Sequence, residues 1–275
     1  MSSSTKTTQN TAVNIFAISA QALPAKARQA VLTIYEYVRE ASAIVQDKDA
    51  DYALSQLGDM QRQTYEAIEH SRHLNPIIKN FATTVRTYHV DIEYIEALFS
   101  SLRMDISSDS FTQQDYRAYV EGRGEALALM VMRVLCYRRA VKFHKCTPGT
   151  RALGAAIAKI ELLQAHGDMH RQRGRLPFPD ITKATFNRAR LAQIIVEIEA
   201  DFRKARQAIA DAPPGSKRAL TILYSLYYEL LIQMRSLSPL QIDKGQAQIT
   251  NWQKYWIVML ATIRPKLALQ RGSRY

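Results

Sequence analysis

The sequence predicts an all-α protein, folded as one helical bundle around a central cavity or a solid core. Apolar residues recur at spacings of three and four along most of the chain, which is the period of an amphipathic helix. Only 10 glycines and 9 prolines punctuate 275 residues that are 47% hydrophobic, too few for a protein of many short strands. The length suffices for one large core, and no internal repeat or domain linker is visible.

The first long helix is predicted from Ala25 to Val45. Val31, Ile34 and Val38 are among the apolar residues that share one face there, and Leu23-Pro24 precedes them. The same spacing predicts the next helices at residues 53–70, 75–88 and 92–103.

A polar break at 107–110 is followed by a helix that runs from Tyr116 toward Phe143. One side of this helix is almost wholly apolar, so we expect it to be central and buried. Pro148 and Gly149 predict a loop at 146–150, and a second loop is predicted at 173–179. The remaining helices are predicted at 151–170, 187–210, 218–234 and 251–269.

Residues 1–13 are rich in Ser and Thr and predict a disordered tail, which leaves residues 14–275 for the helical domain. No run of about 18 apolar residues is present to span a bilayer. Residues 12–23 are similar to a weak secretory segment, but Lys6 is the only charge before them. The two cysteines have no disulfide or metal-binding pattern, so we expect a cytoplasmic protein, with peripheral membrane attachment as an alternative.

The formal net charge is +12, from 37 Lys and Arg against 25 Asp and Glu. This surplus favours a polyanion, an anionic membrane surface or a diphosphate ligand. Nucleic acid is the least favoured of these partners because no recognition motif accompanies the charge. The sequence has no Walker loop, no G-x-G-x-x-G turn and no residue order typical of Ser or Cys hydrolases, which argues against nucleotidases, dehydrogenases and hydrolases.

One region carries a recognisable pattern. Residues 102–106 read Leu-Arg-Met-Asp-Ile, and the helix after them holds Tyr119, Gly122, Leu129 and Met130. Together these motifs resemble the squalene and phytoene synthase family, and the resemblance extends over about Phe16 to Ile263. It implies the all-α isoprenoid synthase fold, in which helices surround a central cavity, and an activity on prenyl diphosphates.

The resemblance also implies two acidic clusters that bind Mg²⁺ through carboxylate oxygens. The first corresponds to residues 42–46, where Ser42, Ala43 and Gln46 stand in place of the acids. We therefore expect no magnesium cofactor and no metal-dependent condensation, so that the protein is an inactive relative of a prenyltransferase.

The second acidic cluster falls at His166 and His170 or, in an alternative register, at Ala165 and Met169. Neither register keeps the acidic pair. His166 and His170 share one helical face at the spacing of two zinc ligands, with His144 as a third candidate. Solvated or core-edge histidines fit the same pattern, so we assign no metal site.

We assign no catalytic residue. If cations replace the metal, the expected contacts of a diphosphate are Arg39, Arg103, Arg171 and Arg175. The residues expected to line the cavity are Tyr35, Ser42, Gln46, Tyr119, Glu121, His166 and His170.

Three functions remain open from the sequence. The first is a protein that binds an isoprenoid diphosphate, a lipid or a protein partner without turnover. The second is a divergent prenyltransferase of the phytoene or squalene synthase type, acting on farnesyl or geranylgeranyl diphosphate. The third is a basic structural or assembly protein at a membrane surface. The cations between Arg133 and Lys145, and those between Arg171 and Arg175, are candidates for binding a diphosphate or anionic lipid headgroups. Attraction of cations to helix C-termini explains the same clusters equally well.

Overall fold

The computed structural model describes residues 15–47, 49–108, 110–173, 178–179, 181, 185–265 and 269; for residues 168–173 it describes the backbone alone. The predicted tail at residues 1–13 lies outside these ranges, as do Arg175 and most of the loop predicted at 173–179. Within them the chain forms helices and no β-strand, which confirms the predicted all-α class.

A short helix over residues 15–20 comes first along the chain. It is followed by α2 (Ala25–Ile44), α3 (Ala50–His70), α4 (Pro76–Tyr88), α5 (Ile92–Ser107), α6 (Gln113–Val120), η1 (Glu121–Ala126), α7 (Leu127–Leu135), α8 (Ala140–Arg173), α9 (Arg188–Asp211), α10 (Pro214–Ser236), α11 (Pro239–Asp243) and α12 (Asn251–Ile263).

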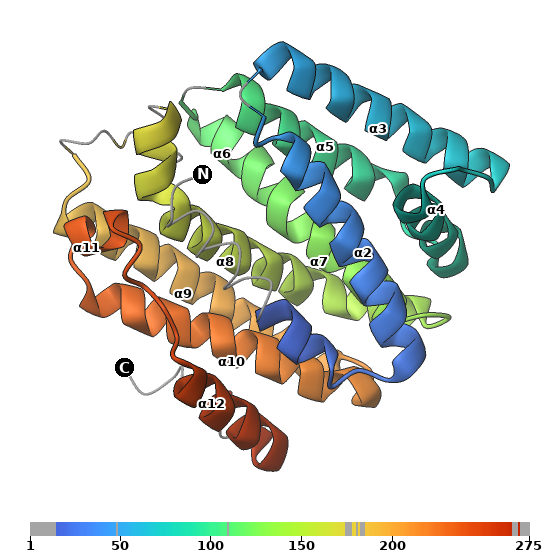
Figure 1. Cartoon of the computed structure of the whole chain (residues 1–275). Helices are drawn as coiled ribbons and strands as arrows, with labels where there is room; N and C mark the ends of the chain where they lie inside the picture. Colours follow the sequence, from blue (N-terminus) through green and yellow to red (C-terminus); the bar gives the residue numbers. More distant parts are fainter. Residues whose placement is uncertain are drawn as a thin grey trace.

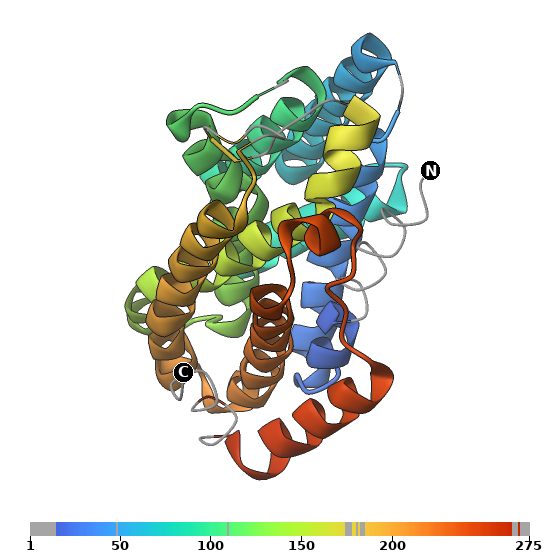
Figure 2. The ribbon, with the colours of Figure 1, turned by 90° about the vertical axis from the view of Figure 1, so that its left-hand side faces the viewer.

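Two groups of helices flank the middle of the molecule (Figure 1). α2 to α5 form one group, and α8 to α12 form the other, with α12 at the outer edge against α10 in both views (Figure 2). α7 packs against both groups because it has apolar residues on two faces. Met130 and Val134 pack into the core of the first group, and Leu129 and Met132 pack into the core of the second.

Several helices begin at side chains that cap them. Asp49 accepts a hydrogen bond from the backbone of Tyr52 at the start of α3. Thr112 and Asp115 form a reciprocal capping box at the start of α6, where the sequence predicts a helix start. The cap at Asp49 starts α3 at Ala50, three residues before the predicted start at residue 53.

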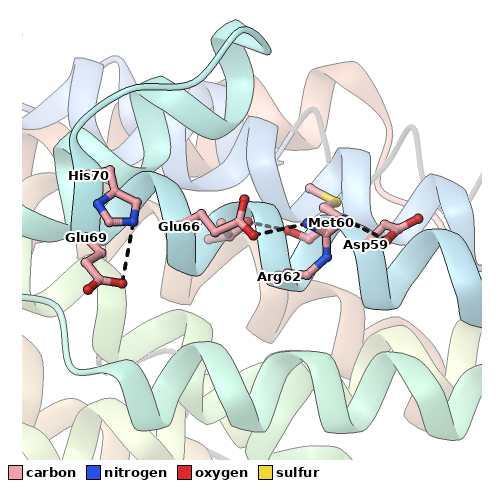
Figure 3. Close-up of polar contacts among 7 residues, drawn as sticks. Asp59, Met60, Arg62, Glu66, Glu69 and His70 are labelled. Atoms are coloured by element: carbon pink, nitrogen blue, oxygen red, sulfur yellow. Dashed lines mark hydrogen bonds and ion pairs between the residues drawn. The ribbon is translucent and has the colours of Figure 1, made fainter.

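The outward face of α3 carries ion pairs (Figure 3). Arg62 binds Asp59 and Glu66, each at 3.0 Å, and contributes little to stability because its side chain is mostly exposed. The inward face is fixed by Thr64, whose hydroxyl lies 2.6 Å from the hydroxyl of Tyr37 on α2. This buried bond holds α3 against α2.

The loop predicted at 146–150 is wrong. α8 runs through this stretch with Pro148 inside it, and the break comes earlier, in a turn at 136–139 where Arg138 has a φ of 58°. Proline removes the donor that would bond the carbonyl of His144. Both His144 and Pro148 are exposed, so water can bond that carbonyl and the helix continues.

The helix predicted from Tyr116 toward Phe143 is divided into α6, η1 and α7, and η1 is a stretch of π-helix. Gly122 packs against the carbonyl of Ala97 on α5, and Gly124 packs against the backbone of Gly154 on α8. Without side chains at these glycines, η1 lies in close contact with both helices. π-helical turns often occur at functional sites, and here the turn carries Arg123 between the two glycines.

Candidate functional site

Arg123 lies at the centre of a polar cluster inside the bundle. Its Nη1 donates a hydrogen bond to Oγ of Ser42 on α2 at 2.9 Å, and its Nε lies 3.8 Å from Oδ2 of Asp105 on α5. Burial raises the pKa of Tyr119 on α6, and the neighbouring groups Asp105 and Arg123 act on that pKa in opposite directions. We call these four residues the arginine cluster.

A carboxyl group on the other side of the centre extends this cluster. Tyr227 on α10 donates its hydroxyl hydrogen to Oε1 of Glu161 on α8 at 2.6 Å. The charges of Glu161 and Arg123 act on each other, and Glu161 also acts on Tyr35 of α2. Side chains of α2 and α8 therefore face each other across the centre of the bundle.

The protonation states in the cluster follow from burial and neighbouring charges. Burial raises the pKa of Glu161, while the hydrogen bond from Tyr227 and the charge of Arg123 oppose the rise. Burial also raises the pKa of Tyr227 well above its usual value, and Glu161 raises it further, so Tyr227 keeps its proton. Burial alone would lower the pKa of Arg123, but Tyr119 and Asp105 outweigh it, so the guanidinium stays charged.

Solvent reaches this centre even though it lies between helices. The side chain of Arg123 is 25% exposed and that of Asp105 is 12% exposed. Tyr35, Ser42 and Glu161 are half-buried. The cluster is therefore partly exposed to solvent, and its one cation is held by contacts from several helices.

The structure brings three of the predicted cavity residues together: Tyr35, Ser42 and Tyr119. It does not bring Gln46 or Glu121 to them. Gln46 is exposed just after the end of α2, and Glu121 is exposed and pairs with Arg151 of α8 at 3.3 Å.

Of the four predicted arginines, Arg39 lies beside the cluster. It is exposed one turn beyond Tyr35 on α2; burial raises the pKa of Tyr35, and the charge of Arg39 opposes that rise. Arg103 is half-buried and donates a hydrogen bond to Gln61 of α3, so the structure does not bring it to Arg123. The side chain of Arg171 and all of Arg175 lie outside the described residues.

His166 points away from Glu161. Its Nδ1 lies 2.8 Å from Oδ1 of Asp243 on α11, and its ring stacks on Phe186 with 4.2 Å between centroids. His144 lies on the same helix 22 residues earlier, roughly 33 Å along the axis, too far to share a metal ion with His166. The side chain of His170 lies outside the described part of the chain.

The described residues do not fit the magnesium sites of the resembled family. Among them, no group of three or more His, Cys, Asp or Glu side chains is placed to hold a metal ion. The two carboxyl groups at the centre are already engaged, since Asp105 pairs with Arg123 and Glu161 accepts from Tyr227. Ala165, one turn beyond Glu161 on the same face, offers no ligand.

The cations between Arg133 and Lys145 mostly bind the protein itself. Arg133 pairs with Asp91 at 2.7 Å and lies over the ring of Phe143, and Lys145 pairs with Asp211 at 2.7 Å. Lys142 donates to the backbone carbonyl of Asp211. Part of this basic cluster therefore stabilises contacts between different segments of the protein.

The fold and its central cluster define an all-α protein of the isoprenoid synthase type. The chain superimposes on a dehydrosqualene synthase crystallised with a ligand with a TM-score of 0.72 at 16% identity, covering 92% of each chain. It matches the squalene/phytoene synthase family over residues 14–253. The chain therefore belongs to that family.

One further relative is similar in sequence, and two further solved structures are similar in fold. A phytoene synthase of Arthrospira platensis is 21% identical over 277 residues, which is 92% of this chain and 89% of the relative. YisP of Bacillus subtilis gives a TM-score of 0.63 at 18% identity, covering 94% of this chain and 99% of its own. Squalene synthase HpnC of Alicyclobacillus acidocaldarius gives 0.54 at 13% identity, covering 78% and 98%.

The patterns in the sequence do not predict two residues at the centre of the site, Arg123 and Glu161. Arg123 lies between Gly122 and Gly124. The sequence could have indicated its central position only if both glycines had been interpreted as sites of close contact with neighbouring helices. Glu161 lies four residues before Ala165, so the register that places the second acidic cluster at Ala165 and Met169 also places Glu161 on the central face. The other register predicts that His166 lies on the central face, but His166 contacts Asp243 of α11 instead.

Proposed function

We propose that this protein binds a prenyl diphosphate at the arginine cluster and does not carry out the family's metal-dependent condensation. The observation that carries the proposal is the bond from Arg123 to Ser42. Ser42 corresponds to an acid of the first magnesium cluster in the resembled family. A fixed guanidinium therefore lies beside the position of that acid, and we infer that it supplies positive charge there without a metal ion.

Arg123 has the donors needed for this role. A guanidinium carries five N–H groups in a planar fork, more than Ser42 and Asp105 accept. Its shape matches two phosphate oxygens at once. Arg39, exposed beside Tyr35, supplies a second cation at the entrance to the cluster.

The carboxyl groups of Asp105 and Glu161 oppose an anionic ligand by charge. Asp105 is neutralised by its pairing with Arg123. Burial already raises the pKa of Glu161 and favours its neutral form, and a bound diphosphate raises that pKa further. The proposal therefore includes uptake of a proton by Glu161 when the ligand binds.

Calorimetry with a non-hydrolysable farnesyl diphosphate analogue, run with Mg²⁺ and with EDTA, tests the proposal. We expect equal affinity in both and weaker binding as salt is added. Incubation with farnesyl diphosphate and Mg²⁺ should give no condensed product above a heat-inactivated control. Binding only with Mg²⁺, or product formation, would instead establish a divergent prenyltransferase. The absence of binding in both buffers would refute the proposal that a prenyl diphosphate is the ligand.

Two variants locate the headgroup. Arg123→Lys keeps the charge but loses the planar fork, so affinity should fall about tenfold, equivalent to about 1.4 kcal/mol. Arg103→Ala is the matched control because Arg103 bonds Gln61 on α3 and should leave affinity unchanged. Equal losses in both variants would mean that the headgroup lies elsewhere.

A further inference from the structure

The exposed side of α12 carries an aromatic and aliphatic stripe. Trp252 is 66% exposed, Tyr255 59% and Trp256 43%, and Ile263 at the far end of the helix is 66% exposed. Their spacings of three, four and seven residues place them on one face, with the half-buried Met259 between them. We call Trp252, Tyr255, Trp256, Met259 and Ile263 the α12 stripe.

The opposite side of α12 holds the helix to the protein. Ile257 and Ala261 are buried against the rest of the core, and α12 packs on α10 at the outer edge of the molecule (Figure 2). Gln253, on the flank, bonds Glu229 of α10. Within the described part of the chain, Trp252, Tyr255 and Ile263 of the α12 stripe therefore remain largely uncovered.

The aromatic rings themselves interact. Trp252 and Tyr255 stack with 6.0 Å between centroids, and Trp256 meets both edge-on. Trp and Tyr combine an apolar ring with a polar group and gather at the boundary between lipid chains and water. A helix with such a stripe on one side lies in the plane of that boundary.

The charge of the sequence around α12 indicates which kind of surface the α12 stripe would contact. Residues 244–275 contain six cations and no Asp or Glu: Lys244, Lys254, Arg264, Lys266, Arg271 and Arg274. Arg264 is exposed directly after the end of α12. Such a segment is attracted to anionic lipid headgroups, whereas in a second copy of the chain it would meet the same six charges.

From the stripe and this charge together, we propose that α12 docks the protein onto an anionic lipid bilayer, with Trp252 and Trp256 in the interface. The proposal does not depend on the ligand at the arginine cluster. Among the helices that the structure describes, none is long and apolar enough to cross a membrane.

The chain contains two tryptophans, and both belong to the α12 stripe, so their fluorescence reports on this surface alone. Adding vesicles that contain phosphatidylglycerol should shift the emission to shorter wavelength, and brominated lipid should quench it. Vesicles of phosphatidylcholine alone should have a much smaller effect, and high salt should reverse the binding. An unchanged emission with anionic vesicles overturns the proposal.

Co-sedimentation with the same vesicles compares variants. Trp252→Ala should weaken binding by about tenfold, since a Trp side chain leaves water when it inserts. Tyr52→Ala is the matched control, an exposed aromatic residue on α3 that should leave vesicle binding unchanged. Loss of binding in the control, or none in Trp252→Ala, contradicts the assignment to α12.

Two other occupants of the stripe give different results. A second copy would make the emission depend on protein concentration without vesicles, and Trp252→Ala would convert a dimer to a monomer in sedimentation velocity. Cover by another part of the same chain would protect both tryptophans from iodide quenching in the absence of lipid. Either result overturns the bilayer proposal.

Discussion

Arg123 has a structural role as well as the proposed role in binding. It neutralises Asp105, whose side chain is 12% exposed, so removal of the guanidinium leaves a nearly buried carboxylate without its cation. Arg123→Met should lower the free energy of unfolding by about 3 kcal/mol, measured in urea. Asp105→Asn added to that variant should restore a large part of the loss. If the double variant is no more stable than the single one, the pair is not the cause.

We expect Glu161 to make the stability of the protein depend on pH. Burial raises its pKa in the folded protein, so its contribution to stability is complete below the pKa of the unfolded chain. That contribution is lost as pH rises through the higher folded pKa. Glu161→Gln removes this dependence while the amide oxygen can still accept from Tyr227. The variant should therefore be more stable than the wild type at neutral pH and differ little below pH of about 4.

The same substitution tests the proton taken up with the ligand. Diphosphate affinity of the wild type should rise as pH falls, beyond the change caused by the ligand's own titration. Glu161→Gln should bind more tightly at neutral pH and show only the ligand's part of that change. Calorimetry of both proteins across the pH range compares them, and parallel profiles would exclude Glu161 as the group that takes up the proton.

η1 and α8 approach each other closely at the site, through the backbones of Gly124 and Gly154. A methyl group on Gly154 would meet the backbone carbonyl of Gly124, which cannot move aside as a flexible side chain can. Gly154→Ala should therefore destabilise the protein by about 2 to 3 kcal/mol in urea. Gly58→Ala in α3 is the control, because nothing lies within 4 Å of the added methyl. There the change should stabilise the helix by up to about 1 kcal/mol.

A second link between elements is polar. Lys159 of α8 is 9% exposed and binds Asp201 of α9 at 2.7 Å as well as Glu197. Burial works to lower the pKa of Lys159, and the bonds to both acids raise it, so the amine remains charged. α8 is thus fixed on one side by an ion pair and on the other by the glycine contact, which leaves Glu161 little freedom to move.

Across the whole molecule, the sequence predicts the helices better than the turns and loops that connect them. The apolar period locates the helical segments because their core faces are continuous. The break before α8 is missed because it contains neither glycine nor proline, while Pro148 lies inside a helix that exposed backbone and water tolerate. A local pattern favours a loop at Pro148, and packing of α8 against η1, α7 and α9 overrides it.

The site is predictable where the family pattern is kept and less so where it has changed. Tyr119 follows from a matched motif, and Ser42 follows from the position of an acid that the family has and this chain lacks. Arg123 and Glu161 match none of the quoted motifs, and contacts between elements distant in sequence bring them together. Arg103 lies in a matched motif and yet contacts Gln61, because a helix face cannot be assigned from a motif alone.

The bond between Arg123 and Ser42 also bears on the evolutionary history of the chain. If an aspartate returned at position 42, its carboxylate would meet the guanidinium already beside that position and form an ion pair. That pairing would occupy the new oxygens before any metal ion could use them. A lineage returning to metal-dependent chemistry would therefore have to lose Arg123 first, and pass through a form in which Asp105 has no counter-charge. If the chain has lost metal-dependent chemistry as proposed, the order of substitutions, more than their number, would make that loss difficult to reverse.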